Sequence, residues 1–308
     1  MISANYQKHF PVMLPQVLEA LNPQDNELYV DATFGNGGYS EAILTKADCK
    51  VIALDRDATV LPRAEELKKA YGNRFEFRQG CFGDFSDLVP EEINGAVFDI
   101  GVSSMQLDQA ERGFSFTKEA PLDMRMSQTG TSAADLVNTL SEQEMADILY
   151  NYGEEKKSRQ IARKIVEARS VKKIETTTEL ANIIYQVIKR THHMSVDPAT
   201  RSFQALRIAV NDELNELKKG LEQASRRLKK NGRLAVVDFH SLEDRIVKTF
   251  FKQNSDKTIH VSRYRKDEPS NPSMALFGFA SKAVVPDTQE IEQNPRSRSA
   301  KMRYGIKN

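Results

Sequence analysis

The sequence has 308 residues, of which 40% are hydrophobic and 28% charged, and its formal net charge is +1. This composition is typical of a globular protein with one large or two ordinary domains, and no stretch approaches the ~18 apolar residues of a membrane span. The N-terminus lacks the pattern of a signal peptide and the two cysteines stand apart, so we expect a cytoplasmic protein without disulfides or structural zinc.

Five short apolar runs are predicted to be strands of a parallel sheet, since strands buried on both faces read as continuous apolar sequence. Helical patterns at 36–47 and 57–71, and a shorter connection at 83–93, separate the first four runs. This alternation is typical of a doubly wound sheet. The strands are expected at residues 28–34, 50–55, 74–79, 95–101 and 233–239.

The alternation breaks after the fourth strand. Gly101 and Arg233 are 132 positions apart, whereas one crossover helix needs about a dozen residues. We therefore predict an all-helical domain at 107–200, inserted into a sheet domain formed by 1–106 and 201–308.

Helix signals fill the insertion. Ser141 and Thr176 each stand three residues before a Glu, which predicts two capping boxes, and the basic segment 155–170 is expected to be a helix between them. One long helix then returns the chain, with an apolar stripe from Phe203 to Leu221 and an end at Asn231-Gly232.

The last part of the chain contains two further apolar runs. Residues 280–286 and 299–306 are expected to form a closing pair of strands.

Positive charge is concentrated in three segments, 154–173, 226–233 and 295–308, which carry eight, five and five Lys or Arg residues. Solvated helix faces and a soluble tail explain any one of them. Three such segments in a nearly neutral protein also favour a polyanion as partner.

The stretch DATFGNGGYS (31–40) connects the first strand to a helix. It lacks the Lys-Ser/Thr of a phosphate-binding P-loop, and Ser40 replaces the third glycine of the dinucleotide fingerprint that Gly35 and Gly37 begin. Asp55, at the end of the second strand, can bind ribose hydroxyls. A nicotinamide dinucleotide, S-adenosylmethionine or a glycine turn without a ligand are all compatible with this pattern.

Nearby carboxylates distinguish between a nicotinamide dinucleotide and S-adenosylmethionine as the ligand. Asp31 precedes the glycines and Asp99 ends the fourth strand. Carboxylates repel a pyrophosphate and attract an ammonium and a sulfonium group, so we favour S-adenosylmethionine.

Several longer motifs together resemble one family, the bacterial small-subunit ribosomal RNA (cytosine-N4)-methyltransferases of the MraW/RsmH type. The motifs include DATFGNGGYS, FDIGVSSMQLD, DPATRSFQALRIAVNDEL, DFHSLEDRIVK and NPRSRSAKMR. The resemblance implies a class I methyltransferase (Rossmann-like) sheet with an inserted helical domain. It also implies N4-methylation of a cytidine of 16S ribosomal RNA in the decoding centre of the small ribosomal subunit, and it is compatible with a homodimer.

By matching motifs, the resemblance implies a set of cofactor contacts. Tyr39 replaces the His that we expect at its position in many members, so a side-chain role there is in doubt. The contacts are Gly35, Gly37, Gly38, Tyr39, Asp55, Phe82, Asp99 and Gln106.

The candidate catalytic residues are Asp99, Asp238 and His240, each at the end of a predicted strand. The fourth strand ends in DIGVSS, not in the (D/N)PP(Y/F) of many amino-methyltransferases, so no known motif identifies the group that orients the cytosine amino nitrogen. Asp238 or His240 can lie near that nitrogen, and His240 can equally be structural. We reject a hydrolase triad because no G-x-S-x-G motif is present.

The segment ERGFSFTKEAPLDMRM supplies candidate RNA contacts. Arg112, Phe114, Phe116 and Arg125 can form a lid on which a displaced base stacks. Alternatively, the phenylalanines fill the core of the inserted domain.

Two other functions stay open. One is an NAD-dependent dehydrogenase, and the other is a non-catalytic RNA-binding factor for ribosome assembly.

Overall fold

The computed structural model describes residues 11–190, 196–255 and 275–308. Residues 1–10, on which the expectation of a missing signal peptide partly rests, lie outside these ranges. The chain divides into two compact units. We call Met1–Gly101 with Leu214–Asn308 the sheet unit, and Val102–Glu213 the inserted unit.

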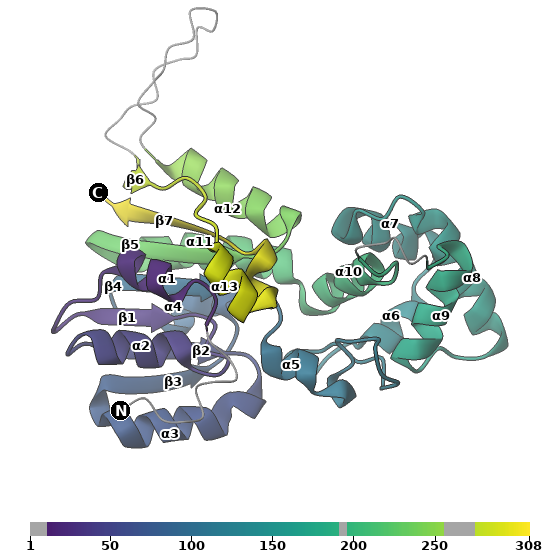
Figure 1. The fold of residues 1–308 in the computed structure, drawn as a ribbon, viewed down its shortest axis with the longest axis horizontal. Coiled ribbons are helices and arrows are strands. Elements are labelled where there is room, and N and C mark those ends of the chain that lie inside the picture. Colours follow the sequence, from purple (N-terminus) through teal and green to yellow (C-terminus); the bar gives the residue numbers. More distant parts are fainter. Residues whose placement is uncertain (1–10, 191–195, 256–274) are drawn as a thin grey trace, which may run out of the picture. The chain divides into compact units, whose positions relative to one another are not determined.

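A seven-stranded sheet forms the centre of the sheet unit, with the strand order β3-β2-β1-β4-β5-β7-β6 (Figure 1). The first five strands in this order are parallel, and β7 pairs antiparallel with both β5 and β6. The strands are β1 (Leu28–Asp31), β2 (Lys50–Asp55), β3 (Phe75–Gln79), β4 (Ile93–Asp99), β5 (Leu228–Asp238), β6 (Phe277–Ala280) and β7 (Lys301–Lys307).

Helices cover both faces of this sheet, which explains why its central strands are continuously apolar. Alternate residues of the strands, such as Val30, Phe98 and Val236, share one core cluster with α4, α11 and α12. The intervening residues face α1, α2 and α3 (Figure 1). These helices are α1 (Leu14–Leu21), α2 (Gly38–Lys46), α3 (Leu61–Tyr71), α4 (Phe85–Leu88), α11 (Glu213–Arg227) and α12 (Ser241–Asn254).

The doubly wound α/β sheet is therefore confirmed, but the closing strands differ from the prediction. The first of them is β6, Phe277–Ala280, and not 280–286. Within 280–286, Val284 makes only an isolated bridge to Met302. The second predicted strand, 299–306, corresponds to β7.

The prediction of a single long helix is also wrong. The chain forms α10 (Thr200–Asn211) and α11, separated by Asp212, which adopts a left-handed φ of 51°. The apolar stripe is divided accordingly: Leu206 packs in the inserted unit and Leu221 in the sheet unit. The helix also ends at Arg227, before Asn231-Gly232, because β5 begins at Leu228.

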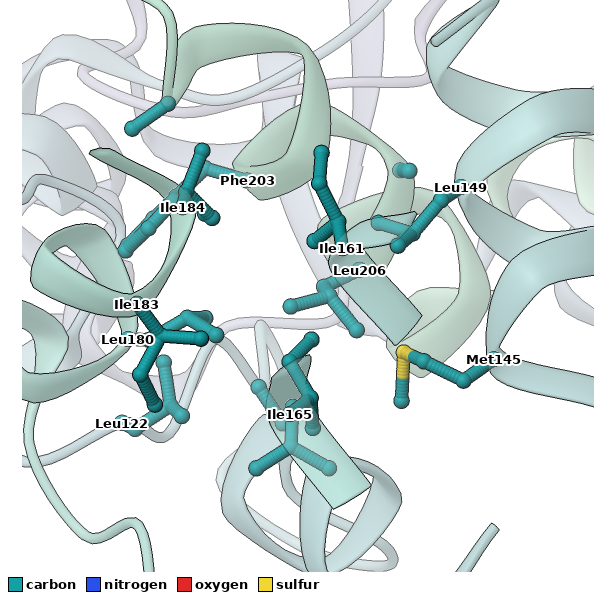
Figure 2. Packing of buried hydrophobic residues seen from close by; sticks show 14 of the residues in the cluster. Leu122, Met145, Leu149, Ile161, Ile165, Leu180, Ile183, Ile184, Phe203 and Leu206 are labelled. Atoms are coloured by element: carbon teal, nitrogen blue, oxygen red, sulfur yellow. The ribbon is translucent and has the colours of Figure 1, made fainter. Parts of the chain in front are cut away.

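The regular elements in the described part of the inserted unit are helices, and the unit has its own hydrophobic core (Figure 2). Both predicted capping boxes, at Ser141 and Thr176, are confirmed. The unit extends from Val102 to Glu213, beyond the expected 107–200, because α10 contributes Phe203 and Leu206 to its core. Its helices are α5 (Ser104–Asp108), α6 (Ala133–Thr139), α7 (Glu142–Gly153), α8 (Ser158–Val171), α9 (Thr177–Val187) and α10.

Candidate functional site

Four parallel strands end in an aspartate at the same edge of the sheet. β2 ends at Asp55, β1 at Asp31, β4 at Asp99 and β5 at Asp238. The strand register aligns these ends, since Asp31 pairs with Val97 of β4, two residues before Asp99. In open α/β sheets, ligands bind outside the carboxyl ends of the strands. A row of carboxyl groups therefore lies where the fold places its ligand.

The glycine loop after β1 needs glycine for conformation and for space. Gly35 and Gly37 have φ values of 50° and 74°, and Gly37 is the N-cap residue of α2. A Cβ on Gly37 would lie 2.8 Å from Phe34 Cε2 and 2.9 Å from Leu67 Cδ1. The loop thus presents backbone and not side chains at this edge.

Asp31 is fully buried and tied to this loop. Its Oδ2 accepts hydrogen bonds from the Ser40 hydroxyl (2.7 Å) and backbone N–H (3.1 Å), and its Oδ1 accepts one from the Thr33 N–H (3.3 Å). Burial raises the pKa of Asp31 to about 6, although these hydrogen bonds oppose the shift.

Asp55 braces the glycine loop from the neighbouring strand. Its Oδ2 accepts a hydrogen bond from the Gly35 N–H (2.8 Å), and its Oδ1 accepts one from the Asp57 N–H (2.9 Å). Burial raises its pKa to about 6 as well. Asp55 therefore holds the loop in position, a role additional to the predicted ribose contact.

Asp99 is the least satisfied member of the row. Its backbone N–H donates to Thr33 Oγ1 (2.7 Å), but its Oδ1 has no hydrogen-bond partner among the described residues. Burial, and then the charges of Asp31 and Glu243, raise its pKa to about 8, while the interaction with the Tyr39 hydroxyl opposes the shift. A cation bound here would relieve this repulsion, so the edge is complementary to a positively charged ligand.

Tyr39, Gly38 and Phe82 surround the same edge in different ways. The Tyr39 side chain is buried, and its hydroxyl donates to the Val12 carbonyl oxygen. Burial, and then the carboxylate of Asp99, raise the pKa of Tyr39 well above its ordinary value. The unexpected tyrosine thus connects the start of α1 to the site. A Cβ on Gly38 would collide with Pro11, and the ring of Phe82, after β3, packs edge-on against that of Phe98.

Gln106 lies in the inserted unit, where it forms the capping box of α5. Its side-chain Oε1 accepts a hydrogen bond from the Ser103 N–H (3.0 Å), and its own N–H donates to Ser103 Oγ (3.2 Å). A cofactor contact by Gln106 stays a prediction.

The four predicted RNA contacts also lie in the inserted unit. The buried Arg112 donates to the carbonyl oxygens of Arg125 and Met126 (both 3.0 Å), and Arg125 is paired with Asp123. Phe114 belongs to the core of the unit, and the centroid of the Phe116 ring lies 4.7 Å from that of a core phenylalanine. These contacts favour the alternative that the phenylalanines fill the core; the lid stays a prediction.

His240 serves as the N-cap of α12, which favours a structural role. Its Nδ1 accepts a hydrogen bond from the Glu243 N–H (3.4 Å), and Glu243 Oε2 accepts one from the His240 N–H (3.2 Å). This reciprocal pair is a capping box in which a histidine replaces the usual Ser or Thr.

Asp238, two residues earlier, borders a pocket of about 340 Å³. Sequence reasoning missed the other side of this pocket, which comes from Val285 and residues 298–301. Only the presence of residues 298–301 in the motif NPRSRSAKMR pointed to part of it. The pocket is lined by Asp238, Phe239, His240, Ser241, Val285, Arg298, Ser299, Ala300 and Lys301.

Within the described ranges, no three His, Cys, Asp or Glu side chains are grouped so that they could hold a metal ion. None of the described helices is long and apolar enough to cross a membrane.

The sequence matches the model of the MraW methylase family over residues 6–307. A ribosomal RNA small subunit methyltransferase H from Rhodospirillum rubrum is 52% identical over 303 residues, which covers 96% of this chain and 93% of the relative. Its counterpart from Rickettsia massiliae is 52% identical over 299 residues, with 96% and 97% covered. That from Paramagnetospirillum magneticum is 50% identical over 302 residues, with 96% and 95% covered.

Proposed function

Because the chain belongs to the MraW methylase family, we propose that it transfers the methyl group of S-adenosylmethionine to the exocyclic N4 of a cytidine in 16S ribosomal RNA, at the decoding centre of the small subunit. The observation that carries this proposal is the buried Asp99 Oδ1, which has no hydrogen-bond partner in the described part of the chain and lies in a row of carboxyl groups beside a glycine loop.

The sheet edge fits S-adenosylmethionine better than a dinucleotide. The cofactor supplies an electrophilic methyl group on a positively charged sulfur. Asp99 and Asp31 favour that charge, the backbone of the glycine loop leaves room for the amino-acid end, and Asp55 accepts bonds from ribose hydroxyls. The same carboxyl groups repel the pyrophosphate of NAD, which disfavours a dehydrogenase.

RNA as substrate is supported by the names of the relatives and by basic segments of this chain. The relatives are named as ribosomal RNA small subunit methyltransferases. α8 of the inserted unit exposes Arg159, Arg163 and Lys164, which suit a phosphate backbone. We assign the protein to the cytoplasm, where small subunits are assembled; a homodimer stays a prediction.

The state of the two cysteines argues against transfer to C5 and so supports the proposed transfer to N4. Methylation of C5 needs a thiolate nucleophile. Burial is the main cause that raises the pKa of Cys49 to about 11 and that of Cys81 to about 12, so both thiols are protonated near neutral pH.

The decisive experiment is mass spectrometry of nucleosides from small-subunit RNA of cells with and without the protein. We expect N4-methylcytidine at the target position to disappear in the deletion strain and to return with the wild-type protein, but not with Asp99→Ala. An unchanged N4-methylcytidine signal would refute the assignment.

The same strains separate the enzyme from a non-catalytic assembly factor. If Asp99→Ala restores subunit assembly and growth while the methyl group stays absent, assembly is a separate role. Stabilisation of the protein by S-adenosylhomocysteine but not by NAD excludes the dehydrogenase.

A further inference from the structure

The pocket at the end of β5 has a buried carboxyl group as its floor. The side chain of Asp238 is 1% exposed, and neither of its oxygens has a hydrogen-bond partner among the described residues. The nearest cation is Arg303, whose Nη1 lies 3.7 Å from Asp238 Oδ2 and also pairs with Asp244. Buried polar atoms are normally hydrogen-bonded, so an unpartnered carboxyl group on a residue that lines a pocket points to a ligand as the source of the donor.

The walls of the pocket suit a flat, uncharged group. Phe239, Val285 and Ala300 supply apolar surface, while Arg298, which is exposed, and Lys301 add positive charge. A phosphate at the floor would be repelled by Asp238, whereas a heteroaromatic amine would offer N–H donors to it. A phosphate attached to such a base could then bind Arg298.

The pocket also lies beside the strand end that carries Asp99. Val237 of β5 pairs with Asp99 of β4, so Asp238 is one residue beyond this pair on the adjacent strand. A base in this pocket would therefore lie at the edge of the sheet that also carries Asp99.

We propose that this pocket receives the target cytosine, and that Asp238 accepts a hydrogen bond and then the proton from its exocyclic amino group. This inference rests on the proposed function. In the reaction the bond between N4 and the methyl carbon forms. The bond between that carbon and sulfur breaks, and its electron pair stays on sulfur. One N4 proton passes to Asp238 and from there to water.

The electrostatic surroundings of Asp238 suit a base that works near neutral pH. Burial, and then the charges of Asp244 and Glu243, raise its pKa to about 7, and Arg303 and Lys301 oppose the shift. A base is most effective when its pKa lies near the working pH.

The first test compares Asp238→Asn with wild type on small subunits from cells that lack the protein. We expect kcat to fall by about 10²–10³-fold, while the affinity for S-adenosylhomocysteine and the KM for subunits change less than about threefold. Glu65→Gln, at an exposed carboxyl group of α3, is the matched control. A kcat within threefold of wild type would overturn the proposal, whereas an inactive wild type would refute the proposed function itself.

The pH dependence gives a more specific readout. Wild type should show a rise of kcat with pH, with a midpoint near 7, since Asp238 must be ionised to accept a proton. Asp244, Glu243, Arg303 and Lys301 face this carboxyl group, and His240 lies next to it. If Asp238→Asn loses the increase of kcat with pH and His240→Asn keeps it, Asp238 is supported as the proton acceptor. The reverse pattern would overturn the proposal.

A binding measurement tests the pocket without turnover. In the presence of S-adenosylhomocysteine, wild type should bind a target RNA about 5–50-fold more tightly when the target base is cytosine than when it is 2-pyrimidinone, which lacks the amino group. Asp238→Asn should lose most of this preference. Equal binding by wild type would overturn the proposal, as would tighter RNA binding by Asp238→Asn, because the latter would indicate a phosphate at the floor of the pocket.

Discussion

Replacing Asp99 by Asn should stabilise the protein in the absence of its cofactor, although it removes a candidate binding residue. Asp99 ends β4 near the charges of Asp31 and Glu243, and its Oδ1 lacks a hydrogen-bond partner among residues 11–190, 196–255 and 275–308. Its pKa is raised from 3.8 to about 8. Because the folded state holds this proton more tightly than the unfolded state, stability falls as the pH rises from about 4 to about 8.

The size of the effect follows from the same shift. Four pKa units correspond to an upper limit of roughly 5–6 kcal/mol, and partial exposure of the Asp99 side chain reduces this limit. We expect Asp99→Asn to raise the free energy of unfolding by about 1–3 kcal/mol near pH 8.5 and by less than about half of that near pH 5.5. The change should be small only below about pH 4, where Asp99 is neutral in both the folded and the unfolded state.

Urea unfolding of the cofactor-free protein at several pH values measures this difference. Asp87→Asn, at an exposed carboxyl group of α4, controls for the loss of one negative charge. Stabilisation by added S-adenosylmethionine should decrease in Asp99→Asn, since the cation then loses its counter-charge. If Asp99→Asn were less stable than wild type near pH 8.5, the carboxyl row would not be a repulsive cluster and the argument would fail.

Two further predictions concern packing. Gly37→Ala should cost about 2–4 kcal/mol of stability, because backbone strain at φ 74° adds to contacts below 3.0 Å. The control is Gly130→Ala, at φ 84° with open space around it, which should cost only about 1–2 kcal/mol. Equal losses of stability in urea unfolding would contradict this account. Leu206→Ala and Leu221→Ala should each cost about 2–5 kcal/mol. Hydrogen exchange should show the loss of protection in α7 and α8 for the first and in β4 and α4 for the second, and one common pattern would contradict the division of the stripe between two cores.

The strands of the sheet could be predicted because each carries its own signal. β1, β2, β4 and β5 are apolar runs that end in Asp, a pattern that depends only on neighbouring residues. β6 was missed because its weak sequence, FGFA, is held by pairing with β7 and not by its own propensity. The run that includes Val284 was more strand-like but makes only an isolated bridge, to Met302 of β7.

The break between α10 and α11 could not be read from periodicity. The apolar spacing continues from Phe203 to Leu221, and Asp212 is not a helix-breaking residue by type. What ends α10 is the left-handed conformation of Asp212, which allows the two halves of the stripe to reach different cores.

The candidate site, too, could be predicted from the sequence only where it depends on neighbouring residues. The glycine loop and the carboxyl row come from local sequence and were predicted. His240 was ambiguous because a histidine three residues before a glutamate can be a base or a cap, and only the hydrogen bonds with Glu243 favour the cap. The pocket at Asp238 depends on Arg298 to Lys301, whose approach to β5 is a tertiary contact.

The position of β7 between β5 and β6 has a consequence for the timing of folding. Lys301, at the start of β7, pairs with Asp238, and residues 298–301 line the pocket that we assign to the target base. During synthesis these residues leave the ribosome after every other strand. The nascent chain can therefore form the glycine loop and the carboxyl groups of β1, β2 and β4 long before it can close the base pocket. On the proposed assignment of this pocket, the target base can be bound only after residues 298–301 have been synthesised and have reached β5.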